Sequence, residues 1–246
     1  MRVICLCFLS AAFGVLLHSD VIDTNNAGDV SAFQAGATVV DFEGIPGRTT
    51  QTISTYTSGD PVSSNSFIFD QIGGVQFSVG GAPGTNEPAL YELSGAIADD
   101  AKSPVTVLGP VDFDFTTKFN SSSLIEIFFP TKVSEVGFWL NPSLGNVLLI
   151  AADTNFAFSH LPETTLESGN VTAGNFVGIE RPSADIGGFK IIALENSGFT
   201  IDDFTFGGGS SSPVVPEPGT FFLFGTVLFI LPLCRRRWRA ALRTPW

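Results

Sequence analysis

Between about residues 36 and 207, short apolar runs alternate with clusters of Gly, Pro, Asn and Ser, and no long helix-forming stretch interrupts them. Most runs alternate apolar and polar residues and are rich in β-branched or aromatic side chains, as half-buried strands are. Many short strands without helices between them predict an all-β chain, folded as an antiparallel, jelly-roll-like β-sandwich. Residues 20–35 and the insertion at 86–103 leave room for a short helix each. We expect strands at 37–43, 66–70, 75–79, 105–108, 111–115, 124–129, 132–140, 147–152, 155–159, 175–180, 189–194 and 199–206.

The first residues have the order of an export signal. Arg2 is followed by an unbroken apolar run from Val3 to Leu17 and then by small and polar residues. A charged start, an apolar stretch and a polar exit are typical of a secretory signal peptide. A retained anchor is the alternative, but about 15 apolar residues are short for a bilayer that needs ~20. We therefore assign residues 1–20 to a signal peptide helix that is cleaved within a few residues of Ser19.

The C-terminal segment carries a short motif, an apolar run and a basic end in that order. The apolar run, 221–234, has 14 residues, which as a helix would span about 21 Å at ~1.5 Å per residue. That is short for a bilayer core of ~30 Å. Prolines keep the preceding motif extended, where a protease can grip it, and the arginines would remain cytoplasmic. The motif and the basic end are Val215, Pro216, Glu217, Pro218 and Arg235, Arg236, Arg237.

This tail resembles the PEP-CTERM sorting signal of Gram-negative bacteria. The resemblance implies that an exosortase, a membrane-embedded cysteine protease or transpeptidase, processes the chain near Pro-Glu-Pro. It also implies that a precursor tethered to the inner membrane becomes a protein of the cell surface or the extracellular matrix. An ordinary anchor that is never cut is the alternative. The predicted organisation is a signal peptide (1–20), a β-sandwich domain (21–207), a flexible linker (208–215) and a sorting signal (216–243) with a transmembrane helix at 220–234.

Four motifs extend the resemblance into the central domain: VVDFEG at 39–44, GVQFS at 74–78, VSEVGFWL at 133–140 and FTIDDFTFGG at 199–208. They are similar to segments of other exported PEP-CTERM proteins, whose domains look like the β-sandwiches of lectins and carbohydrate-binding modules. This second resemblance implies a β-sandwich of the carbohydrate-binding kind, and the sorting signal implies delivery to the cell surface or an exopolysaccharide matrix.

The central domain is strongly acidic and lacks cysteine. Residues 21–216 hold six basic and 22 acidic residues, a net charge of −16. Such a surface repels phosphate backbones, which argues against nucleic acid as a partner. All three cysteines lie in the terminal apolar runs, at Cys5, Cys7 and Cys234. Disulfides, thiolate zinc sites and thiol nucleophiles are therefore excluded from the domain.

Four carboxylates mark the two ends of the domain. Asp41 and Glu43 lie on the first strong strand pattern, and Asp202 and Asp203 lie on the last. Terminal strands of a jelly roll commonly lie side by side, which would bring the four groups together. Calcium prefers six to eight oxygen ligands, so the sequence raises the hypothesis of a structural calcium ion here. Solvent-facing carboxylates or turn caps are the alternative.

Trp139 is the candidate sugar-binding residue. In VSEVGFWL a core-facing set of apolar residues alternates with Glu135, Gly137 and Trp139. If these three face outward, the glycine leaves the indole ring open for stacking against the apolar face of a pyranose. Phe128 shares an outer face in LIEIFF and could lie nearby. The alternative is that a loop covers both rings as a minor core.

Asp112 and Asp114 form a two-residue spacing that paired carboxylates of glycosidases can adopt, with Glu126 as a further candidate acid. Solvent-side neighbours on a strand produce the same pattern. The sequence contains no HExxH, GxSxG, P-loop or dinucleotide fingerprint. The leading prediction is therefore a non-enzymatic, exosortase-processed surface or matrix protein. A calcium-dependent carbohydrate-binding module is the first alternative, and a glycan hydrolase is the weaker one.

Overall fold

The computed structural model describes residues 20–57, 59–80, 87–112, 114–120, 123–153 and 164–208. The predicted signal peptide helix, most of the linker, the sorting signal with its transmembrane helix and the strand at 155–159 lie outside the described residues. Within those residues, no helix is long and apolar enough to cross a membrane. The chain divides into two units at Gly209/Ser210, and all described residues belong to the first.

The described residues form strands, one α-helix and two 3₁₀ helices. The bounds are β1 (Asp20–Thr24), α1 (Ala27–Phe33), β2 (Thr38–Val40), β3 (Gln51–Ile53), η1 (Ser64–Ser66), β4 (Gln76–Ser78), β5 (Ala89–Leu93), η2 (Gly95–Asp100), β6 (Thr106–Gly109), β7 (Leu124–Val133), β8 (Glu135–Leu140), β9 (Val147–Ala152), β10 (Thr165–Val171), β11 (Phe176–Glu180), β12 (Ile186–Ala193) and β13 (Ile201–Gly207).

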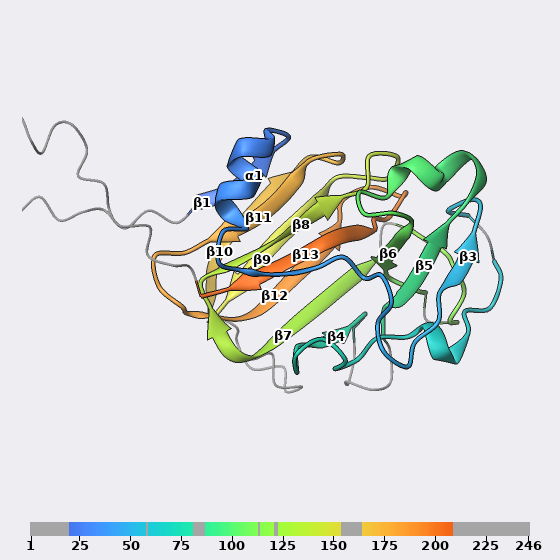
Figure 1. Cartoon of the computed structure of the whole chain (residues 1–246), viewed down its shortest axis with the longest axis horizontal. Coiled ribbons are helices and arrows are strands. Elements are labelled where there is room, and N and C mark those ends of the chain that lie inside the picture. Colours follow the sequence, from blue (N-terminus) through green and yellow to red (C-terminus); the bar gives the residue numbers. More distant parts are fainter. Residues whose placement is uncertain are drawn as a thin grey trace, which may run out of the picture. The chain divides into compact units, whose positions relative to one another are not determined.

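The strands form two sheets that pack as a sandwich (Figure 1). One sheet has eight strands in the order β1-β11-β8-β13-β6-β5-β3, with β2 paired to β13; the other has five, in the order β10-β9-β12-β7-β4. Aromatic side chains from both sheets meet in the core. Phe138 of β8 contacts Phe189 of β12, and Phe77 of β4 contacts Phe204 of β13. The predicted β-sandwich is confirmed.

Strand predictions succeeded where the period-two pattern was long, at β7, β8, β9, β11, β12 and β13. They were wrong at 66–70, where the chain makes only an isolated bridge at Phe67, and at 111–115, where a loop passes through Phe115 at φ 58°. The expectation of purely antiparallel pairing was wrong for β3 and β5, which pair in parallel. The insertion at 86–103 holds β5 and η2, and the polar strands β1 and β10 were not predicted.

Helix α1 lies on the outer face of the eight-stranded sheet, above β11 and β8 (Figure 1). Asn26 caps it by accepting a hydrogen bond from the N–H of Gly28, and Val30 and Phe33 are its buried residues. The helix approaches closely because Gly137 of β8 and Gly178 of β11 are paired directly opposite each other. A short helix within residues 20–35 was expected from the sequence, and α1 confirms it.

Both ends of the described domain lie at the same end of this sheet. Asp20 of β1 pairs with Glu180 of β11, Glu180 pairs with Glu135 of β8, and Glu135 pairs with Gly207 of β13. These four residues therefore form one row across four strands. The row defines the end of the sheet where the domain joins the rest of the chain.

Candidate functional site

A hollow of about 190 Å³ lies at the opposite end of β8 and β13 from this row. Trp139 and Asp202 are register partners on these two strands, so their side chains share the outer face of the sheet. The segment after η2 and the loop after β8 complete the walls. The residues with functional groups among its lining are Asp99, Asp100, Lys102, Trp139, Asn141, Thr200 and Asp202.

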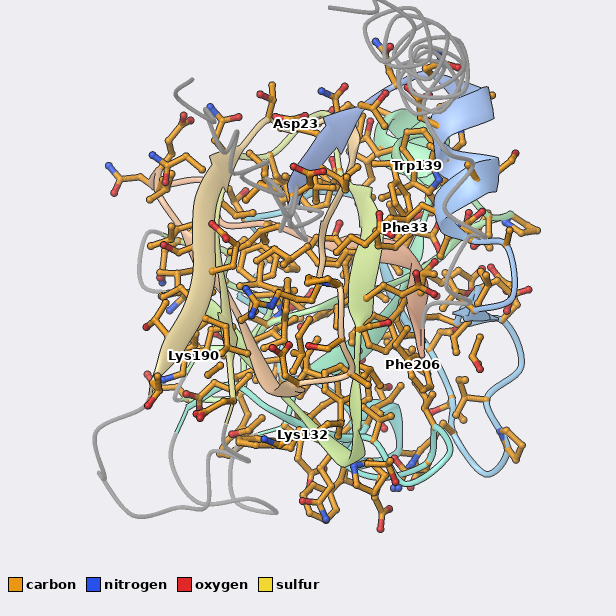
Figure 2. All side chains as sticks on the ribbon, turned by 90° about the vertical axis from the view of Figure 1, so that its left-hand side faces the viewer. Asp23, Phe33, Lys132, Trp139, Lys190 and Phe206 are labelled. Carbon is orange, nitrogen blue, oxygen red and sulfur yellow. The ribbon has the colours of Figure 1, made fainter. Side chains whose placement is uncertain are left out.

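Trp139 is half-buried rather than fully open. The Lys102 ammonium lies 4.2 Å from the centroid of its ring, a cation–π contact, and the ring of Phe176 meets it edge-on at 5.7 Å. Trp139 packs against a small cluster of Val30, Phe33 and Phe176, and Figure 2 shows Trp139 and Phe33 on the side of the sheet next to α1. The ring is thus held rigidly while still lining the hollow.

Two details of the prediction for this aromatic site were wrong. Gly137 does not leave the indole open, because a Cβ added there would lie 2.8 Å from Phe176 and 2.9 Å from Phe33, which fill that space. Phe128 does not lie near Trp139, since it is in β7 of the other sheet, where it is buried against Ala152. The minor core that the sequence left as an alternative exists for Trp139, but a helix rather than a loop covers it.

A hydrogen-bonded network lies around the hollow. Asn141 donates to the hydroxyls of Tyr56 (2.6 Å) and Thr200 (2.9 Å), and the Asp100 carboxylate accepts from Tyr56 (2.8 Å) and Ser143 (2.8 Å). Burial, with a further contribution from Asp100, raises the pKa of Tyr56, so its hydroxyl keeps its proton. These groups are committed to one another and fix the wall of the hollow.

Of the four predicted carboxylates, Asp41, Asp202 and Asp203 lie near one another, because β2 pairs with β13. Two of the four, Asp202 and Glu43, act as acceptors for backbone donors. Asp202 accepts from the N–H groups of Lys102 (2.7 Å), Ser103 (2.7 Å) and Asp203 (2.7 Å) and from the Ser103 hydroxyl (2.6 Å). Glu43 similarly accepts from two N–H groups and one hydroxyl of Val105 and Thr106. The segment between η2 and β6 is held in place by these carboxylates.

The backbone also separates the four groups. Asp41 and Glu43 do not share a strand face, because they follow β2 and flank Phe42, whose φ is 62°. Asp203 lies at a bulge with φ 47° and is half-buried. Burial, then the charges of Asp202 and Asp41, raises the pKa of Asp203 to about 6.

This donor set does not fit the predicted calcium site. Calcium needs oxygens that converge on one point, whereas the oxygens of Asp202 and Glu43 already accept from N–H and O–H groups. Within the described ranges, no group of three or more His, Cys, Asp or Glu residues could hold a metal ion. The alternative that the sequence left open, carboxylates acting as caps, describes Asp202 and Glu43.

Of the candidate hydrolase residues, Asp112 and Asp114 line a second hollow of about 150 Å³, and Glu126 is not part of its lining. Asp112 lies in a loop and accepts from Thr116 and from the N–H of Asp114, and Lys118 is 3.7 Å away. Partial burial opposes ionisation, but these hydrogen bonds and the lysine outweigh it and lower the pKa of Asp112. Glu126 forms an ion pair of 3.2 Å with Lys190 on the neighbouring strand β12. Asp112 is thus held ionised, which suits structure better than proton donation.

Sequence reasoning missed Lys102, Asn141 and Glu135. The first two become part of the hollow only through contacts with distant segments, and no local pattern marks them. Glu135 is 4% exposed, and its Oε1 is buried with no hydrogen-bond partner among the described residues. Burial, then the charge of Glu180, raises the pKa of Glu135 to about 7. The alternating pattern of VSEVGFWL predicts that Glu135 lies on the outer face of the sheet, but it does not predict that the side chain is buried there.

Comparisons with known proteins found one matching family. Residues 214–239 match the PEP-CTERM protein-sorting motif. No curated protein matches the chain. Among solved structures, the carbohydrate-binding module TmCBM61 in complex with β-1,4-galactotriose has 17% identity over 56% of this chain and 90% of its own, with a TM-score of 0.32. The enzymatically active domain of bacteriophage CBA120 tailspike protein 4 has 13% identity over 60% and 21%, with a TM-score of 0.29.

These two structural scores carry no argument about ligand or activity. The motif match does identify the sorting signal, because its residues include the Pro-Glu-Pro element and the arginines that the sequence indicated. The C-terminal segment of this chain is a PEP-CTERM sorting motif, the mark of an exported protein that an exosortase processes.

Proposed function

We propose that the protein is a non-enzymatic component of the cell surface or extracellular matrix, delivered there by exosortase processing at Pro216-Glu217-Pro218. The sorting motif at 214–239 is the observation that supports this proposal. Among the candidate hydrolase carboxylates, Asp112 and Glu126 have structural partners, Thr116 and Lys190, which favours a non-enzymatic role over hydrolysis. We place the mature domain outside a Gram-negative cell, where it associates with exopolysaccharide.

The position of the hollow within the sandwich is compatible with a role at a surface. The domain joins the C-terminal segment through Gly207, at one end of β13, while the hollow lies at the other end near Asp202. Glu135 and Trp139, which mark the same two ends on β8, are separated by four residues, or about 13 Å at ~3.3 Å per residue. A domain held through Gly207 would thus present the hollow away from its attachment point.

Processing is tested by expressing the full chain in a bacterium with an exosortase and in a mutant of that bacterium lacking it. We expect a C-terminally shortened protein in the surface or matrix fraction of the first strain and a full-length, membrane-bound protein in the second. Mass spectrometry of the purified protein locates the new C-terminus.

A Glu217→Ala variant should block this shortening, while Pro213→Ala, a substitution just before the matched motif, should not. A full-length protein in both strains, with export intact, would mean that the segment is an uncut anchor.

A second function, carbohydrate binding, is supported by the position of Trp139 at the hollow. A rigid indole beside polar groups is suited to stack on a sugar ring and to orient it. Because the carboxylates of Asp202 and Glu43 serve as caps, we propose that this binding does not depend on calcium.

A further inference from the structure

The polar groups that line the hollow fall into two sets. Asp100, Asn141 and Asp202 are saturated by hydrogen bonds to protein groups, as described above. The carboxylate of Asp99 and the ammonium of Lys102, in contrast, have no hydrogen bond or ion pair with any described residue; the lysine lies over the Trp139 ring, and its charge also acts on Asp203. The hollow thus presents one acceptor, Asp99, and one donor, Lys102, that make no hydrogen bond within the described part of the chain.

We propose that the hollow binds a single uncharged pyranose unit of a polysaccharide. Trp139 offers an apolar face for the C–H side of the ring. The Asp99 carboxylate accepts a hydrogen bond from one hydroxyl, and the Lys102 ammonium donates to another. Since Lys102 is exposed, its ammonium can move from the indole face to the rim when a sugar enters. This inference deepens the proposed surface function by naming the class of ligand.

Size and charge both restrict the ligand. At about 190 Å³ the hollow is smaller than the ~300–1,000 Å³ typical of drug-sized ligands, so it takes one ring rather than an oligomer. Three carboxylates line it against one ammonium, and the half-buried Asp203 adjoins Asp202. In a domain of net charge −16, an acidic sugar such as a uronate would meet a repulsive field. The structure therefore favours neutral sugars.

The test uses the full chain, purified in a detergent without a sugar headgroup, and isothermal titration calorimetry. One set of probes consists of neutral oligosaccharides of glucose, galactose and mannose, and the other of oligouronates. We expect saturable binding of at least one neutral probe, unchanged by chelator and by added salt, and no binding of oligouronates. Binding of oligouronates alone would overturn the inference on charge while leaving a surface glycan-binding role intact. Binding of neither set would overturn the inference and the carbohydrate-binding function together, but not exosortase processing.

Variants locate the site. Trp139→Ala should weaken the neutral probe by about tenfold or more, the size of effect expected when a stacking face is lost. Asp99→Ala tests the free acceptor on an exposed residue, where folding is not at risk, and should weaken binding by about threefold to tenfold. The matched controls are Phe115→Ala, an exposed aromatic outside the hollow, and Asp60→Ala, an exposed carboxylate outside it. Binding unchanged in Asp99→Ala, or lost equally in the controls, would place the sugar elsewhere.

Discussion

Replacing Gly178 by alanine should destabilise the domain measurably. A Cβ at this position would lie 2.5 Å from the carbonyl oxygen of Val136 and 2.9 Å from the Cα of Gly137, both backbone atoms of the paired strand β8. It would also lie 3.3 Å from the ring of Phe33 in α1. Strand β8 is hydrogen-bonded on its other side to β13, so it cannot move away freely, and the added methyl group is accommodated only by strain.

Overpacking of this kind costs about 1–3 kcal/mol. For a domain of this size each kcal/mol lowers Tm by about 2–4 °C, so Gly178→Ala should lower Tm by about 2–12 °C. The assay is thermal unfolding of the full chain, followed by circular dichroism. Gly137→Ala should cost less, because the nearest atoms, at 2.8 and 2.9 Å, belong to the rings of Phe176 and Phe33 rather than to backbone.

Gly208→Ala is the matched control, since no atom lies within 4 Å of the Cβ it would add. Its free energy of unfolding should stay within about 0.5 kcal/mol of the wild-type value. If Gly178→Ala unfolded at the wild-type temperature, the close approach of β11, β8 and α1 would not be a source of specificity, and the argument from the paired glycines would be refuted.

Three further predictions concern the carboxylates. The pKa of Glu135, raised to about 7 from 4.5 by burial and by Glu180, means that the folded state holds a proton that the unfolded chain has lost. The free energy of unfolding should therefore fall as pH rises from about 4.5 to about 7. Urea unfolding at several pH values measures this dependence, and Glu135→Gln should make it weaker. An unchanged dependence in the variant would assign it to other groups. Asp202→Ala should lower Tm by several degrees, because the N–H groups of Lys102 and Ser103 lose their acceptor and each unsatisfied donor costs about 1–3 kcal/mol of stability. Asp202→Asn keeps one side-chain oxygen and should lower Tm less. Calcium at millimolar concentration should leave Tm unchanged, and a rise that a chelator reverses would show that the capping carboxylates rearrange around an ion.

The parts of the fold that could be predicted are the strands whose residues alternate with a period of two. Residues 124–127 and 147–151 alternate buried and less buried positions, as strands of a two-sided sheet do. The neighbourhood of Asp41 and Asp202 was also predicted, because the first strong strand pattern, β2, pairs with the last strand, β13. The polar strand β10 was not, since Thr165–Val171 gains its place only by pairing with β9. The parallel pair of β3 and β5 likewise depends on a connection that no local pattern encodes.

The sequence predicted one residue of the candidate site, and the fold brought the other residues to it. Trp139 was identified from its outward position on a strand. Lys102, which covers its ring, and Phe33, which packs in the same cluster, come from segments far away in the sequence. Gly137 was read as open space beside the indole, but α1 uses that space. A glycine indicates that another group can come close to the backbone, but only the tertiary structure shows whether that group is a helix or a ligand.

The sequence by itself determined the class of fold and the destination of the protein. Both depend on order along the chain: period-two alternation specifies strands, and a motif, an apolar run and arginines in succession specify a sorting signal. The tertiary structure alone decided which carboxylates are caps, which aromatic ring is covered and which polar groups remain free at the hollow. These properties depend on distances between residues that are remote in sequence, and they arise only when two sheets and a helix are packed together.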